Sequence, residues 1–188
     1  MAGKKRKRAE DKERYELIGI RVDDYHVKAE ASINFYLAEP NLAEYLEDDP
    51  AYLFESSIEI TGTALLPENR SGDIYEIKLI GETSPSRRLA ATVKDCQLRD
   101  GSGVPRYRSY RGREIAVYRQ PPDFGLLEKA RGERKWRGWA NVAPRLLTDM
   151  LVTLSHQKQA YVSLHERRIE RRRKIHGIAL QTAYPAEE

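Results

Sequence analysis

Hydrophobic and polar positions alternate along much of the chain, most clearly over residues 26–37. One set of apolar positions there comprises Val27, Ala29, Ala31, Ile33, Phe35 and Leu37. Successive side chains of a strand point to opposite faces, so this pattern predicts a half-buried antiparallel strand. Residues 15–22 are predicted to be its partner, joined to it through a tight turn at Asp23–Asp24.

The same alternation recurs in shorter segments that are separated by proline, glycine, asparagine and serine. It predicts further strands over residues 57–66, 74–80, 88–98, 107–118, 135–142, 160–169 and 174–182. The last two are expected to form a hairpin around residues 170–173. A helix over 166–174 is the alternative, and its lack of an apolar stripe favours the hairpin.

Two segments have helical rather than strand spacing. Residues 40–50 lie between two prolines and contain a short apolar stripe. Residues 144–155 begin with Pro144, which suits a first helical turn, and their apolar positions recur with helical period at Leu147, Met150, Leu151 and Leu154.

About eight or nine strands with only two short helices predict a mainly β fold, an antiparallel β-sandwich or a barrel-like domain. Residues 1–14 lack apolar periodicity and are expected to form a disordered basic arm. Residues 15–188 are expected to form a single β-rich domain.

Composition narrows the class of protein. The chain has 188 residues, of which 33% are charged and 40% hydrophobic, as in a folded domain with a heavily ionised surface. Cys96 is the only cysteine, so an intrachain disulfide is excluded, and we expect this side chain to be buried on a strand. No apolar run approaches the ~18 residues of a membrane span. We expect a cytoplasmic protein with no membrane partner.

Charge is divided unevenly along the chain. Residues 15–86 hold 4 Lys/Arg against 15 Asp/Glu, a net charge of −11, whereas residues 87–176 hold 22 against 9, a net charge of +13. Either these two halves face each other or the basic half binds an anionic partner.

Two segments of the basic half interleave cations with aromatic residues, as single-stranded nucleic acid requires for phosphate neutralisation and base stacking. The candidate residues are Arg106, Tyr107, Arg108, Tyr110, Arg111 and Arg113 in the first segment, and Trp136, Arg137 and Trp139 in the second. The two tryptophans are three positions apart and would point to opposite faces of a strand, so one of them belongs to the core. Ordinary sheet strands with outward arginines are the alternative interpretation.

A third cationic cluster lies at the predicted C-terminal hairpin and comprises Arg167, Arg168, Arg171, Arg172, Arg173 and Lys174. At a hairpin tip it would form a protruding cationic finger that could enter a polyanionic groove. A solvated turn that deters edge-to-edge pairing of sheets explains it equally well.

Evidence for an enzyme is thin. The chain has no nucleophile elbow, phosphate-binding loop or dinucleotide-binding turn, and nothing in it indicates a cofactor or a metal site. Glu68, followed by Glu76 and Lys78, has the outline of a metal-dependent nuclease motif, but these residues lie in the acidic half, away from a DNA-gripping surface.

We therefore expect a non-enzymatic binding module whose basic half engages an anionic partner, with nucleic acid favoured over an acidic protein surface. The alternative is a structural subunit that self-assembles, or docks on another protein, through complementary acidic and basic surfaces. The metal-dependent nuclease is the third hypothesis.

Overall fold

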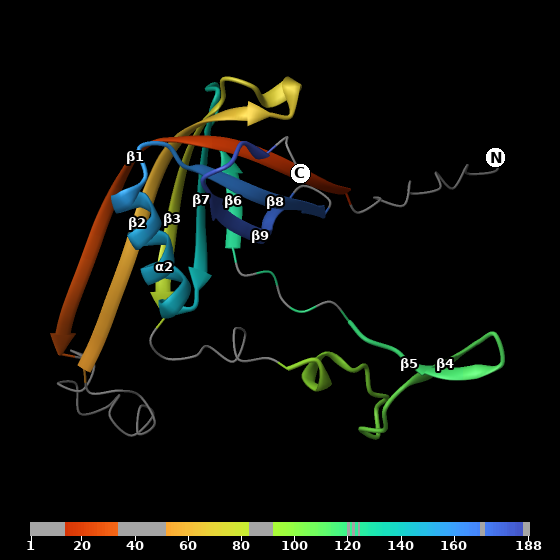
Figure 1. Cartoon of the computed structure of the whole chain (residues 1–188). Helices are drawn as coiled ribbons and strands as arrows, with labels where there is room; N and C mark the ends of the chain where they lie inside the picture. The colour runs from red at the N-terminus through yellow and green to blue at the C-terminus, as the bar shows by residue number, and fades with distance from the viewer. Residues whose placement is uncertain are drawn as a thin grey trace, which may run out of the picture.

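The computed structural model describes residues 14–33, 52–82, 92–119, 121, 123, 125–169 and 172–185 (Figure 1). Its strands are β1 (Arg14–Ile33), β2 (Tyr52–Leu66), β3 (Ile74–Glu82), β4 (Tyr107–Tyr110), β5 (Arg113–Ala116), β6 (Gly125–Lys129), β7 (Lys135–Val142), β8 (Tyr161–Ile169) and β9 (Arg172–Gln181). Its helices are α2 (Pro144–His156) and two 3-10 turns, η2 (Glu68–Arg70) and η3 (Lys94–Cys96).

Seven strands close into a barrel in the order β1-β2-β3-β7-β6-β9-β8, and β4 and β5 form a separate hairpin. The predicted mainly β fold is confirmed, and the barrel-like arrangement is the one that the chain adopts. The barrel strands pair antiparallel except β3 and β7, which run parallel. Strand β6 lies between β3 and β7 along the chain and pairs antiparallel with the other edge of β7.

The interior of the barrel is filled by branched aliphatic residues whose alternation along the strands matched the sequence pattern. The fully buried members include Ile18, Ile20, Ile58, Ile60, Ile77, Leu79, Leu164 and Ile175. Helix α2 adds Leu147, Met150 and Leu154 to this core, so its predicted apolar stripe is confirmed.

The turn predicted at Asp23–Asp24 is wrong, because β1 runs through it as one strand of 20 residues. The pairing with β2 shifts register between Val22 and Asp24, which marks a β-bulge. Gly62 lies opposite this point, and a Cβ atom there would meet the carbonyl oxygen of Arg21. The ribbon therefore bends where two backbones come too close for a side chain.

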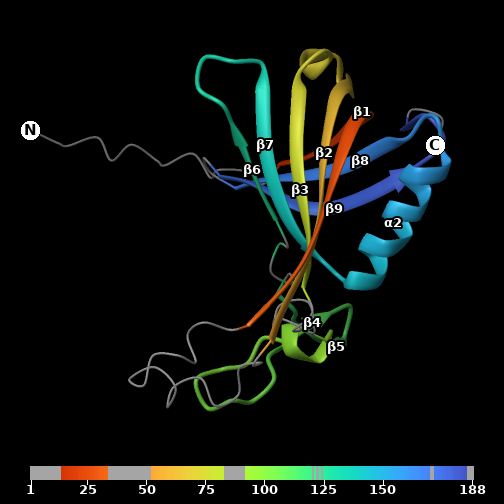
Figure 2. The ribbon, with the colours of Figure 1, turned by 90° about the vertical axis from the view of Figure 1, so that its left-hand side faces the viewer.

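The predicted half-burial of this strand is also wrong over residues 26–31. The side chains of residues 26–31 are exposed on both faces of the strand, although apolar and polar residues do alternate along it. Beyond the bulge, β1 leaves its partner β8 and continues beside β2 as the outermost strand of a ribbon that extends past the barrel (Figures 1 and 2). Periodicity predicted the strand here, but burial depends on what covers its face.

Residues 92–119 form a small unit outside the barrel. The backbone N–H of Arg106 donates to the Leu98 carbonyl at 2.8 Å, and the N–H of Leu98 donates to the Val117 carbonyl at 2.8 Å. Cys96 is buried as expected, but on the 3-10 turn η3 rather than on a strand. The predicted strand over 107–118 is instead the β4–β5 hairpin.

This hairpin turns at Arg111 and Gly112, which have φ values of 50° and 75°. Two consecutive positive φ angles are the signature of a tight two-residue hairpin turn. An arginine in the first of these positions concealed the turn from the sequence pattern, which favours asparagine or glycine there.

Several predictions fall on segments outside the described residues. These are the arm up to residue 13, the helix over 40–50, and the outer parts of the strands predicted at 26–37 and 88–98.

Candidate anion-binding surfaces

The candidate residues occupy three places in the structure. Those of the first segment lie on or next to the β4–β5 hairpin, those of the second on β7, and those of the third on β8 and β9. Arg171 lies outside the described residues. The three groups differ chiefly in how far neighbouring carboxylates neutralise them.

The β4–β5 hairpin sorts its side chains by face. Arg108 pairs across the strands with Ile115, and Tyr110 pairs with Arg113, so these four share one face. The opposite face carries Tyr107, Ser109, Glu114 and Ala116. The hairpin therefore separates the two arginines of its strands, with Tyr110, from Glu114, its only carboxylate.

The face with Arg108, Tyr110 and Arg113, here called the hairpin face, is open to solvent. Tyr110 is 51% exposed, and Arg111 at the turn stacks on its ring, with the guanidinium carbon 5.3 Å from the ring centroid. Among the described residues, no carboxylate forms an ion pair with Arg106, Arg108, Arg111 or Arg113. These guanidinium groups are available to an external anion.

The two tryptophans of β7 point to opposite faces, as predicted. Trp136 is 3% exposed inside the barrel, where its Nε1 donates a 2.9 Å hydrogen bond to Asp73, whereas Trp139 is 44% exposed on the outside. Arg137 shares the outer face and donates to Glu76 at 3.1 Å. Trp136 therefore belongs to the core and is not a surface for base stacking.

The predicted C-terminal hairpin is confirmed as β8 and β9, but it is not a uniformly solvated finger. Arg167 is buried and donates to Asp123 at 2.5 Å, and Lys174 lies 3.2 Å from the same carboxylate. Arg173 is half-buried and donates to Glu166. Arg168 and Arg172 remain exposed. Much of this cationic charge is neutralised within the chain.

A cleft of about 390 Å³ opens at the end of the barrel where β8 ends and β9 begins. Eight charged side chains line its wall, five of them cationic and three of them carboxylates. The lining residues are Arg14, Tyr15, Glu16, Asn69, Arg70, Asp73, Lys129, Trp136, Glu166, Arg168 and Arg173.

A buried ion-pair network forms the floor of this cleft. Arg70 donates to both carboxylate oxygens of Glu166 at 2.8 and 3.2 Å and to the Tyr75 hydroxyl at 3.1 Å. It also lies 2.5 Å from Glu16, and its guanidinium carbon is 4.5 Å from the centroid of the Trp136 ring. The hydrogen-bonding capacity of Arg70 is thus largely used inside the protein.

The titration behaviour of this network follows from burial and pairing. Burial by itself would lower the pKa of Arg70, but the hydrogen bonds to Glu166 and Tyr75 raise it above its ordinary value. Burial raises the pKa of Tyr75 to about 12. Burial would raise the pKa of Asp73, but hydrogen bonds from Trp136 and Arg134 lower it. Arg70 and Asp73 therefore stay charged, and Tyr75 stays protonated, throughout the neutral range.

Sequence reasoning missed Arg70, Glu16 and Asp73 because they belong to the acidic half. One signal was available: Arg70 is one of the four cations of residues 15–86, and it lies in the turn between Pro67 and Gly72. A lone cation among carboxylates is a candidate for a buried ion pair.

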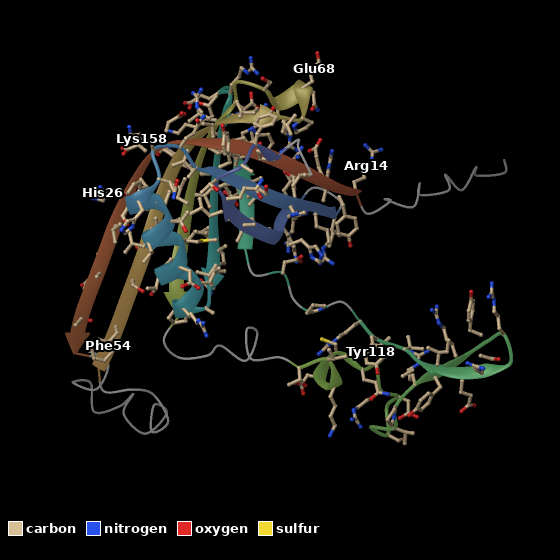
Figure 3. All side chains as sticks on the ribbon, viewed as in Figure 1. Arg14, His26, Phe54, Glu68, Tyr118 and Lys158 are labelled. Atoms are coloured by element: carbon tan, nitrogen blue, oxygen red, sulfur yellow. The ribbon has the colours of Figure 1, made fainter. Side chains whose placement is uncertain are left out.

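The residues of the nuclease pattern do not gather into one site. Glu76 and Lys78 share the outer face of β3, but Glu76 is paired with Lys135 at 2.6 Å and Lys78 lies 3.6 Å from Glu55. Glu68 lies on η2, near the upper edge of Figure 3. Within the described ranges, no three His, Cys, Asp or Glu residues are grouped so as to hold a metal ion.

No helix within the described part of the chain is long and apolar enough to cross a membrane. No family model, no curated protein and no solved structure matches this chain.

Proposed function

We propose that this protein is a non-enzymatic module that binds nucleic acid, with single-stranded nucleic acid as the preferred form. The observation that carries the proposal is the hairpin face, where Arg108, Arg113 and the turn residue Arg111 surround an exposed Tyr110. No carboxylate of the described residues forms an ion pair with these arginines. Guanidinium groups neutralise phosphates, and an exposed aromatic ring stacks on unpaired bases.

The state of the other cations supports this choice. Strands β3 and β7 run side by side, so Asp73 and Glu76 of the acidic half pair with Arg134, Lys135 and Arg137 of the basic half. In the barrel, the two charge halves therefore compensate each other. The hairpin lies outside this arrangement, and its positive charge is the part that calls for an external partner.

The same compensation weighs against the alternative of head-to-tail assembly through the two charge halves, because ion pairs inside one barrel already use much of that charge. An acidic protein surface is a second ligand that the hairpin arginines would accept, but it gives no role to the exposed ring of Tyr110.

The salt dependence of binding tests the electrostatic part of the proposal. The experiment measures the affinity for a fluorescently labelled single-stranded oligonucleotide by anisotropy over a range of salt concentrations. Replacing Arg108 and Arg113 by serine should reduce the slope of log affinity against log salt by about 1.4, because each phosphate contact on a single strand contributes about 0.7.

A matched control removes the same charge elsewhere. Arg145 on α2 and Lys158 after it are both exposed, and replacing them by serine lowers the net charge equally. This control should leave the slope almost unchanged. Equal effects of the two double variants would show a non-specific charge effect, and the absence of binding at ~50 mM salt would refute the proposal.

The stacking part is tested by two tyrosines of nearly equal exposure on opposite faces. Tyr110 is 51% exposed and Tyr107 is 55% exposed. Tyr110→Ala should weaken binding by about 5- to 150-fold, the value of one stacked base. Tyr107→Ala should have little effect. An equal loss in both variants would argue that the hairpin binds without base stacking on this face.

A further inference from the structure

Within the described part of the chain, the second half of β1 has a neighbouring strand along one edge and an open edge on the other. Residues 25–33 pair with β2 on one side, and the pairing with β8 on the other side ends at Arg21. This part of β1 is the outermost strand on the left of Figure 1, and in Figure 2 it crosses in front of the other strands. Its outward backbone N–H and C=O groups form a template for another strand.

The side chains along this edge are self-complementary. Lys28 and Glu30 lie on one face, on either side of Ala29. We propose that two copies of this chain pair antiparallel along this edge, around a two-fold axis at Ala29. Such an interface is isologous, so each contact occurs twice.

The register of this pairing follows from the symmetry. Ala29 lies opposite Ala29 of the second copy, Lys28 opposite Glu30, and Val27 opposite Ala31. Both ion pairs thus form between directly facing positions, where opposite charges stabilise a sheet. Any shift in register would lose both pairs, so the charges specify one alignment.

The existing sheet supplies a reason for the second copy to bind. Glu30 lies directly opposite Glu55 of β2, so like charges face each other, and the cation beside Glu55 is Lys78 of β3 at 3.6 Å. In the single chain, Lys28 forms an ion pair with Glu30 from the same strand. The dimer places Lys28 of the second copy next to Glu30, on the side away from Glu55. Glu30 then has a facing cation as well as a facing carboxylate.

On the opposite face of the ribbon, the same pairing would bring apolar side chains of the two copies together. Val27 and Phe54 are exposed there, and a shallow hollow of about 350 Å³ is lined in part by Ala29, Ala31 and Phe54. Side-by-side pairing of two β1 edges places the two Val27-Ala29-Ala31 rows next to each other. Exposed apolar surface of this kind is typical of an interaction site.

Disulfide trapping tests the axis directly, because Cys96 is the only native cysteine and Cys96→Ser removes it. In that background, Ala29→Cys should crosslink two copies, since facing Cα atoms are about 4.5–5.5 Å apart. Val27→Cys alone should not crosslink, because its two copies lie about 13 Å apart along the strand. A mixture of Val27→Cys with Ala31→Cys should crosslink.

Charge reversal tests the register. Lys28→Glu and Glu30→Lys each place like charges opposite one another and should weaken the dimer about tenfold in analytical ultracentrifugation. The double swap Lys28→Glu/Glu30→Lys restores both pairs and should restore the affinity. Replacement of Arg108 and Arg113 should leave the dimer unchanged, so this test is independent of nucleic-acid binding.

Three results would overturn the inference. One is a protein that stays monomeric at every accessible concentration, as expected if another segment of the chain covers the edge. Another is crosslinking that is as efficient through position 27 alone as through position 29. The third is a double swap that is no better than the single reversals, since the facing charge pairs would then be absent.

Discussion

Removal of the Glu166 carboxylate should destabilise the barrel, because it leaves the buried guanidinium of Arg70 without its principal counter-ion. The side chains of Arg70 and Glu166 are 7% and 2% exposed, and two hydrogen bonds join them. In Glu166→Ala, the guanidinium of Arg70 stays inside the protein without its principal counter-ion. Breaking a buried pair in this way costs about 3–5 kcal/mol.

The structure places the effect at the lower end of that range. Arg70 keeps Glu16, the Tyr75 hydroxyl and the face of Trp136 as partners. We therefore expect a loss of about 3 kcal/mol in the free energy of unfolding, or about 6–12 °C in Tm for a chain of this size. Urea denaturation followed by circular dichroism measures this loss at equilibrium.

Two further variants separate burial from simple loss of charge. Glu76 also holds two cations, Lys135 and Arg137, but its side chain is 39% exposed, so Glu76→Ala should cost at most about 1 kcal/mol. The double variant Arg70→Met/Glu166→Met removes both buried charges and should cost less than Glu166→Ala alone. The reasoning fails if Glu166→Ala is no more destabilising than Glu76→Ala.

The bend of β1 depends on Gly62, so Gly62→Ala should lower the free energy of unfolding by about 1–3 kcal/mol, whereas Gly101→Ala, which has open space around it, should be neutral in the same urea titration. Met150→Ala empties a buried position of α2 and should cost about 2–5 kcal/mol, against a small effect for the exposed Val152→Ala; equal costs would mean that α2 is not packed as described. The Tyr75 phenol should lose its proton near pH 12 rather than 10, as followed by ring ¹³C NMR. Because its pKa is raised in the folded state, the stability it contributes is full below pH 10 and falls as the pH rises towards 12. Loss of the Tyr75 proton near pH 10 would contradict its burial.

The predictable parts of the fold are the elements whose apolar residues recur with a regular local period. The alternation of residues 57–66 and 74–80 and the helical spacing from Leu147 to Leu154 each describe which side of one element is apolar. The odd spacing of Trp136 and Trp139 placed them on opposite faces for the same reason. The charge division between the two halves was equally visible. These properties depend only on neighbouring residues, so the sequence by itself determined them.

Other features depended on which segments meet. No local pattern indicates that β3 lies parallel to β7, that Asp123 and Glu166 neutralise the C-terminal arginines, or that the end of β1 projects past the barrel. Asp123 is 44 residues away from Arg167, and Glu166 is 96 residues away from Arg70. The attraction between two charges depends on their separation in space, and not on how many residues lie between them in the sequence. Tertiary structure alone therefore decided which cations are buried in ion pairs and which, on the β4–β5 hairpin, form no ion pair with a carboxylate of the described residues.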